Sequence, residues 1–370
     1  MNAGQFLDEV LRQFYALTTV QVEDNIDLYF FPGVEIDSVS CQLRPQHIQY
    51  LKFFMQNHDR FFSVWSALQN LESKKLFVKL ILYRLLGPGH VRIHPHWGWK
   101  EEAALLEKAR SYRKEPSAIL LPQHPRFGPL FHYEGVPCEG GTISFDGWDM
   151  NVASSFLKKQ YFFDRSSPSI RPEPGDYVID AGTCLGDSAL AFSQAVGDSG
   201  RVFSFDPLPV HIELAQHNQW LNQFKNTLFL EQALGESTRE KERVVSTDHT
   251  VSPGLRVTER DNQFSFVTLD DFMEKHSVPH LDFIKMDIEG SEMQALKGAH
   301  ITLERFRPKL AISLYHNPVD FLVIPQFLRT CFPFYELYLD HYTIHEEETI
   351  LYARPRDEQP PAVPQPLTLV

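Results

Sequence analysis

Residues 177–187 read YVIDAGTCLGD, and this stretch decides the fold class of the chain. A short apolar run ends in Asp180, passes through Gly182 and Gly186, and leads into a helical pattern at residues 188–192. A strand, a glycine turn and a helix in this order are typical of the place where a doubly wound sheet holds a nucleotide-like cofactor. We expect the two glycines to remove side chains where the backbone approaches that ligand closely.

The spacing of these glycines excludes the dinucleotide fingerprint. A G-x-G-x-x-G motif that starts at Gly182 requires glycine at positions 184 and 187, where this chain has Cys184 and Asp187. An acid at the end of the loop suits a cationic cofactor better than a pyrophosphate lying on a helix N-terminus. S-adenosylmethionine, with its sulfonium and ammonium groups, fits this loop. An NAD-dependent oxidoreductase is disfavoured on the same spacing.

A second strand ends in an acid at a matching distance. Residues 201–206 read RVFSFD, which places Asp206 24 positions after Gly182. In such folds an acid about 20 residues past the glycine turn accepts hydrogen bonds from ribose hydroxyls. Asp206 followed by Pro207 is also compatible with a helix cap. We favour ribose binding, because the glycine loop precedes it in register.

The chain resembles the FkbM-type methyltransferases, a family of S-adenosylmethionine-dependent enzymes. The resemblance covers roughly residues 175 to 354 and follows the family's order. Its motifs are GTCLGDSAL (182–190), FDP (205–207), TLDDF (268–272), IKMDIEGSE (284–292), LKGA (296–299), RPKLAISLYH (307–316) and ETILYA (348–353). One position departs from the family, whose second strand usually ends in Glu. The shorter Asp206 can still accept a hydrogen bond from a ribose.

This resemblance implies methyl transfer to a hydroxyl of a small molecule or carbohydrate. The helical segment at residues 73–85 is similar to one found upstream of the methyltransferase domain in some members. The Tyr315-His316 and His341-Tyr342 pairs look like those of members associated with surface-polysaccharide synthesis, which favours a sugar as acceptor. An N-methyltransferase and a catalytically silent interaction module stay open as alternatives.

Composition limits the classes of partner. The chain has 35 Lys and Arg against 48 Asp and Glu, a net charge of −13, which argues against nucleic acid and against anionic lipid. Its four cysteines form no CxxC pair, so reduced thiols are expected. The first ten residues lack the basic start and apolar core of a signal peptide, and no apolar run of about 18 residues occurs. We therefore expect a cytoplasmic protein without a membrane span.

The sequence divides into four parts. Residues 1–115 carry apolar residues at helical spacing and form a mainly helical N-terminal region that shapes the substrate site or makes homo-oligomer contacts. Residues 116–174 are rich in proline and glycine and form a connecting segment with short strands at most. Residues 175–355 form the methyltransferase domain, and the proline-rich tail 356–370 is expected to be disordered.

The predicted fold class is α/β, with a doubly wound, mostly parallel sheet of seven strands. Strands and helices alternate from residue 177 to residue 331, which is typical of a parallel sheet covered on both faces. The segment that follows the third strand, up to about residue 262, reads as irregular and polar, and one helix is expected at 290–304. Residues 335–341 and 349–353 predict a terminal antiparallel hairpin.

Candidate chemical residues stand at the ends of the predicted strands, where the ligand crevice of such sheets lies. His316 follows the fifth strand and is the best candidate general base, because the pKa of a histidine can lie near working pH. Asp287 ends the fourth strand, with Glu289 and Glu292 just beyond it, and His341 is a second candidate base. Each has a structural alternative, such as complementing a helix N-terminus or bonding a loop carbonyl.

The predicted cofactor set combines these strand ends with the glycine loop. Lys285, in the buried fourth strand, needs a partner and is expected to pair with one of the acids at 287–292. Ala233 and Leu234 follow the third strand, where such folds flank an adenine ring. No third oxygen ligand is identifiable beside Asp287 and Glu289, so no metal is predicted, and His90, His94 and His96 do not have a metal-binding spacing. The predicted cofactor-binding residues are Asp180, Gly182, Thr183, Gly186, Asp187, Asp206, Ala233, Leu234 and Asp287.

Overall fold

A sheet of seven strands forms the centre of the computed structural model, which describes residues 1–29, 45–119, 127–165, 167–243 and 263–356. Five strands run parallel, and β13 pairs antiparallel with both β11 and β12. The predicted fold class, including the terminal hairpin, is confirmed. Across the sheet the order is β12 (Tyr335–His341), β13 (Thr349–Pro355), β11 (Lys309–Ser313), β10 (Phe283–Met286), β4 (Tyr177–Ala181), β5 (Arg201–Phe205) and β6 (Thr227–Leu230).

Helices cover both faces of this sheet, as the alternation of the sequence predicts. Side chains that alternate along a strand enter two separate cores, so Ile179 packs on one face and Val178 on the other. The expected helix at 290–304 is two helices, because the chain breaks at Gly298, where a Cβ atom would lie 2.0 Å from the carbonyl oxygen of Gly235. The helices are α6 (Asp187–Val196), α7 (Pro209–Leu221), α8 (Leu269–Lys275), α9 (Glu292–Lys297), α10 (His300–Phe306) and α11 (Asp320–Cys331).

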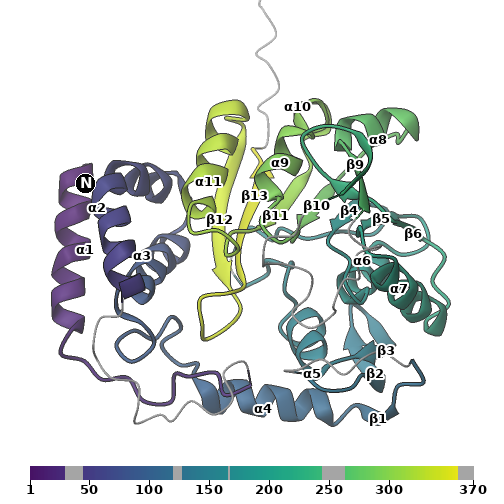
Figure 1. Ribbon diagram of the computed structural model, residues 1–370, viewed down its shortest axis with the longest axis horizontal. Helices are drawn as coiled ribbons and strands as arrows, with labels where there is room; N and C mark the ends of the chain where they lie inside the picture. Colours follow the sequence, from purple (N-terminus) through teal and green to yellow (C-terminus); the bar gives the residue numbers. More distant parts are fainter. Residues whose placement is uncertain (30–44, 120–126, 166, 244–262, 357–370) are drawn as a thin grey trace, which may run out of the picture.

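The N-terminal helices pack against the β12 edge of the sheet, as Figure 1 shows. The hydroxyl of Ser73 donates to the carbonyl of Leu339 at 3.1 Å, and the ring of Phe77 stacks on that of Phe321 with centroids 4.7 Å apart. These helices therefore share a hydrophobic core with the sheet. They are α1 (Ala3–Leu17), α2 (Pro45–Ala67) and α3 (Leu71–Leu86). The fourth helix of this region, α4 (Trp99–Arg110), lies apart from them and packs instead against residues 149–157.

Two small sheets lie outside the central sheet. The connecting segment forms β1 (Arg113–Pro116), β2 (Phe131–Cys138) and β3 (Gly141–Gly147), followed by α5 (Asp149–Asn151) and a π-helix (Val152–Leu157). The segment expected to be irregular contains β7 (Ala233–Leu234) and β8 (Arg239–Arg243), which pair with β9 (Gln263–Val267). Pairing with a strand distant in sequence stabilises β7 and β8, and short-range pattern does not reveal it.

Two further expectations concern the C-terminal tail and membrane-spanning helices. The predicted disordered tail lies outside the described residues, apart from Arg356, whose amide donates to the carbonyl of Phe334 at 2.9 Å. Within the described residues, no helix has both the length and the apolar character needed to cross a membrane.

Candidate active site

A cavity of about 1370 Å³ opens at the carboxyl ends of β4, β5, β10 and β11. Its floor carries Gly182, Asp206, Asp287 and His316, which the sequence predicts at this edge. Its walls come from elements far away in the sequence: α2, the end of α3 with the turn 86–90, the π-helix, β9 and the loop 345–348. The topology therefore brings the candidate residues into one enclosed space.

Both glycines of the loop are required by chain packing. Gly182 and Gly186 have φ angles of +87° and +85°, which an L side chain rarely adopts. A Cβ atom on Gly182 would lie 1.8 Å from the carbonyl oxygen of Asp287, and one on Gly186 would lie 2.8 Å from the Cα of Ala215. Gly182 lines the cavity, whereas Gly186 does not. The structure therefore places Gly182 at the predicted cofactor site and packs Gly186 against Ala215 of helix α7.

A buried ion pair holds the loop from below. The Lys285 ammonium lies 3.2 Å from Asp180 Oδ1 and donates to the carbonyl of Gly182 at 2.6 Å. Burial acts to lower the pKa of Lys285, but the charges of Asp180 and Asp287 outweigh it and raise that pKa. The partner of Lys285 is therefore Asp180 on the neighbouring strand, and not one of the acids at 287–292 as expected.

Asp180 and Thr183 are fully buried and do not line the cavity. Asp180 accepts hydrogen bonds from Ser188 at 2.9 Å, Ser204 at 2.7 Å and Thr183 at 3.2 Å. Its carboxylate is hydrogen-bonded by protein groups, so the structure places these two predicted residues behind the glycine loop and not at the cavity surface. They hold the loop in shape through hydrogen bonds that leave no face open to a ligand.

Asp206 lines the cavity and also organises the chain around it. Its carboxylate accepts from the amide of Cys184 at 3.0 Å, from the amide of Leu208 at 3.0 Å and from His211 Nδ1 at 2.9 Å. These bonds occupy three of the roughly four acceptor positions of a carboxylate. Asp206 thus binds backbone amides, as the helix-cap alternative from the sequence requires. The other nitrogen of His211, Nε2, is buried without a hydrogen-bond partner.

The side of the cavity near β7 and β9 contains apolar surface. Ala233 and Leu234 line it, as predicted, and Phe264 and Phe266 of β9 join them from a segment that sequence pattern did not assign to a strand. Asp187 also lines the cavity and accepts a short hydrogen bond from Ser155, and burial raises the pKa of its carboxyl. Apolar walls with a few convergent polar groups are typical of cofactor sites.

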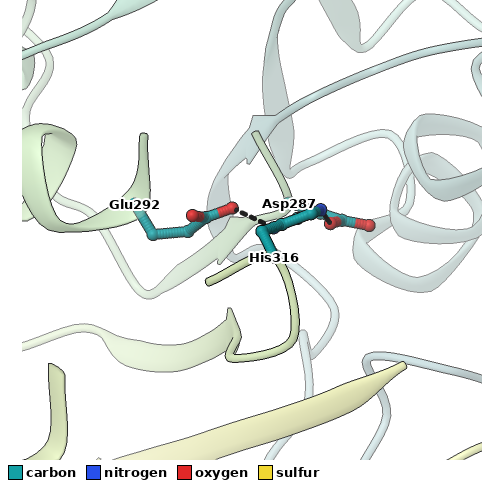
Figure 2. Close-up of side chains that lie close together, drawn as sticks. All are labelled: Asp287, Glu292 and His316. Atoms are coloured by element: carbon teal, nitrogen blue, oxygen red, sulfur yellow. Dashed lines mark ion pairs between the residues drawn. The ribbon is translucent and has the colours of Figure 1, made fainter. Parts of the chain in front are cut away.

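Three acids surround His316 where β10 and β11 end. Figure 2 shows the imidazole between Glu292 and Asp287. Nδ1 lies 2.9 Å from Glu292 Oε1, and Nε2 lies 3.3 Å from Asp287 Oδ1 and 3.5 Å from Glu289 Oε2. Burial acts to lower the pKa of His316, but the bond to Glu292 and the charges of all three acids raise it to about 10. His316 is therefore an imidazolium at neutral pH and has no free lone pair with which to accept a proton.

Asp287 is fixed by hydroxyl groups as well as by His316. The Tyr161 hydroxyl donates to it at 2.6 Å and the Tyr315 hydroxyl at 2.9 Å. Burial acts to raise the pKa of Asp287, but His316, Lys285 and these hydroxyls lower it on balance. A carboxylate held by two hydroxyls and an imidazole, with the charge of Lys285 nearby, is a weak base that anchors its neighbours.

Glu289 is the most open acid of this group. Its side chain is 45% exposed, it lines the cavity, and its backbone has a φ of +56°. Partial burial at the cavity wall, together with the nearby charges of Asp287 and Glu292, raises the pKa of Glu289 to about 7 against the lowering effect of the His316 charge. A carboxyl group with this pKa can take up and release a proton near neutral pH.

A family model described as the methyltransferase FkbM domain matches residues 180–332. Residues 180–332 are an FkbM methyltransferase domain. "Methyltransferase 1" of Beauveria bassiana (strain ARSEF 2860) is 25% identical over 167 residues, which cover 39% of this chain and 66% of that protein. The crystal structure of methyltransferase FkbM from Methylobacillus flagellatus KT is similar in fold, with a TM-score of 0.51 and 20% identity, over 82% of this chain and 60% of that one. The chain thus spans less than two thirds of both proteins.

His341 does not reach the cavity of the methyltransferase domain. It is fully buried, its Nδ1 lies 2.8 Å from the hydroxyl of Thr349, and burial together with the nearby His94 holds its pKa well below the usual range. The structure does not place this predicted base beside a substrate, because β12 lies at the far edge of the sheet.

The sequence identified no third metal ligand beside the acids at the end of β10, but the structure brings three possible ligands together. Asp287, Glu292 and His316 offer atoms within 4.8 Å of one another. In the structure the two nitrogens of His316 lie beside two different acids, Nδ1 by Glu292 and Nε2 by Asp287. A metal ligand needs a neutral ring that offers one lone pair.

Several residues of the site were not predicted from the sequence, because they do not follow strands of the sheet. Tyr161 and Gln160 come from the connecting segment, and Gln160 donates a short hydrogen bond to Glu348, whose pKa burial raises to about 8. Arg84 comes from α3. No sequence signal marked these residues as functional.

Proposed function

We propose that this methyltransferase acts on a hydroxyl group of a small molecule or carbohydrate, with S-adenosylmethionine as methyl donor. The observation that carries the proposal is the position of Glu289, an accessible carboxyl group that lines the same cavity as Gly182 of the glycine loop and lies 3.5 Å from His316. Its raised pKa agrees with this position. The reaction type fits this group, because an alcohol must lose a proton as it attacks a methyl group.

The residues of the cavity fit the proposed cofactor. When bound, S-adenosylmethionine supplies a methyl group on a sulfonium sulfur. Leu234 and Phe266 offer an apolar slot for the adenine, Asp206 with His211 faces the ribose, and Asp187 offers negative charge to the cationic methionine end. The backbone approaches closely at Gly182, where no side chain obstructs the loop.

Glu289 accepts the proton of the acceptor hydroxyl in this proposal. The His316 imidazolium, 3.5 Å from Glu289, holds the carboxylate in place while its own proton stays bound. Asp287 and Glu292 in turn hold His316 from two sides. The roles suggested from sequence are thereby exchanged, with Glu289 as base and His316 as its positioning residue.

An N-methyltransferase is the second candidate. A neutral amine attacks through its lone pair and needs no base in the methyl-transfer step. The raised pKa of Glu289 favours the hydroxyl, because such a group has no necessary task beside an amine. The walls also carry Gln46, Tyr50 and His90, which suits a polar acceptor such as a sugar.

Calorimetry with S-adenosylhomocysteine and with NAD tests the cofactor assignment. We expect saturable binding of S-adenosylhomocysteine and none of NAD, because the loop lacks the spacing that holds a pyrophosphate. Binding of NAD without any response to S-adenosylhomocysteine would contradict the methyltransferase proposal. A panel of nucleotide sugars and oligosaccharides, assayed for methyl transfer, then identifies the acceptor.

His211→Phe should weaken binding of S-adenosylhomocysteine by roughly 3- to 10-fold, the value of one hydrogen bond. Asp206 accepts from Nδ1–H of His211, so Nε2 is left as an acceptor for a ribose hydroxyl. The 2′,3′-dideoxy analogue provides the check, because its affinity should be the same for both proteins. His217→Phe, on the same helix but outside the cavity, is the matched control. Equal losses for both ligands would mean that His211 only supports Asp206.

Turnover should persist after dialysis against EDTA. The His316 imidazolium already neutralises part of the charge of Asp287 and Glu292, so no cation is needed to relieve their repulsion. The measurement is methyl transfer before dialysis, after dialysis, and after addition of magnesium or manganese. Loss of activity that either ion restores would show that Asp287, Glu292 and His316 form a metal site.

A further inference from the structure

One cation that lines the cavity has no ion-pair partner among the described residues. Among the described residues that line the cavity, Arg84 and Lys285 carry fixed positive charge. Lys285 is committed to Asp180 and to the carbonyl of Gly182. Arg84 forms no ion pair with any described residue, although the chain carries a net charge of −13. An arginine without a carboxylate partner, in an acidic protein and inside a ligand cavity, requires an explanation.

The position of Arg84 is fixed by aromatic rings. Its guanidinium lies over the ring of Phe321 at 5.3 Å and over that of Tyr50 at 5.9 Å, and its Nε is buried without a hydrogen-bond partner. These contacts hold the planar group in one orientation, and neither ring gives the guanidinium a carboxylate partner. Glu346 lines the same cavity, yet it is exposed and lies beyond ion-pair distance of Arg84.

The strand order decides which part of a substrate Arg84 meets. The proposed cofactor residues lie at β4 and β5 and at the neighbouring strands β7 and β9, and the proposed base Glu289 follows β10 near the middle of the sheet. Arg84 lies at the end of α3, which packs on β12 at the opposite edge (Figure 1). An acceptor with its hydroxyl at Glu289 therefore extends its remaining part, and not the cofactor, toward Arg84.

We propose that the methyl acceptor carries an oxyanionic group, a carboxylate or a phosphate, that Arg84 binds. This inference rests on the proposed function and adds the substrate class to it. Guanidinium groups match the geometry of these anions with two parallel hydrogen bonds, and such charge-assisted bonds are among the strongest in proteins. The acid-rich side of the cavity then receives the cationic cofactor, and the Arg84 side receives the anionic end of the acceptor.

The test uses the complex with S-adenosylhomocysteine and three sugar probes that differ in one group: glucose, glucuronate and glucose 6-phosphate. Calorimetry should show that at least one anionic probe binds roughly tenfold or more tightly than glucose, as expected for charge-assisted hydrogen bonds. The glucuronate and phosphate arms tell which oxyanion is bound. Arg84→Gln should abolish the difference, whereas Arg305→Gln should keep it, because Arg305 also lies over an aromatic ring but outside the cavity.

Arg84→Lys is the second variant, because it keeps the charge if the glutamine variant does not fold. It should retain part of the preference for the anion and lose its bidentate component. The inference is overturned if no probe binds, if the three probes bind equally, or if Arg84→Gln leaves the preference unchanged. Absence of S-adenosylhomocysteine binding to the wild type would instead defeat the proposed function, so the two failures are distinguishable.

Discussion

Glu289→Gln should lower the kcat of methyl transfer by about 10²–10⁴-fold, the usual contribution of a positioned general base. The substitution keeps the size of the side chain and removes its ability to accept a proton. Because 45% of the side chain is exposed to the cavity, the fold should be unaffected. Affinity for S-adenosylhomocysteine should stay close to that of the wild type, since the base acts on the acceptor. The assay uses the acceptor that the panel identifies.

The pH profile gives an independent check of this role. Glu289 must be ionised to accept the proton, so kcat/KM should rise as the pH increases through about 7, where its carboxyl loses its proton. His316 stays charged until about pH 10, so its ion pair with Glu289 persists over this range. Glu289→Gln should abolish the rising limb. Glu274→Gln, on the surface of α8, is the control with an unchanged profile.

Retained turnover in Glu289→Gln would transfer the role to another acid of the group. Asp287 is then the next candidate, although its three hydrogen-bonding partners and lowered pKa make it a weaker base. His316 would regain the role only if the variant's profile showed a limb near pH 10, where that imidazolium loses its proton.

Lys285→Met should lower the free energy of unfolding by about 3–5 kcal/mol, the usual effect of removing one partner from a buried ion pair. Lys285 and Asp180 are 2% and 0% exposed, so the substitution leaves an uncompensated carboxylate in the core. Binding of S-adenosylhomocysteine should be lost as well, because the carbonyl of Gly182 loses its donor and the loop its anchor. Chemical denaturation and calorimetry measure the two effects.

Two further variants separate the buried pair from ordinary surface charge. Lys297→Met breaks an exposed pair with Glu236 and should change stability by less than about 1 kcal/mol. Asp180→Asn combined with Lys285→Met should recover part of the lost stability, because the buried charge is then absent. Wild-type stability in Lys285→Met alone would show that the pair does not hold the loop.

The sequence alone determined the sheet and the edge at which the site lies. Alternation of apolar strands with helices, the loop at 182–187 and the terminal hairpin are local patterns. Apart from the helix expected at 290–304, which is two helices, the elements they predict lie within two residues of their predicted bounds. Because the carboxyl ends of parallel strands meet at one edge, the positions of Asp206, Asp287 and His316 in the chain were sufficient to place them on one cavity.

Only the tertiary structure decided what these residues do. The chemistry of an ionisable group depends on its neighbours in space, and pattern cannot reveal that three acids surround His316 or that Asp180 faces Lys285. His316 therefore changes from an expected base to a cation, and Glu289 becomes the group with a pKa near 7. Elements that are distant in the sequence pack together to form the walls of the site, and no local pattern predicts this packing. Arg84 of α3 reaches the cavity in this way.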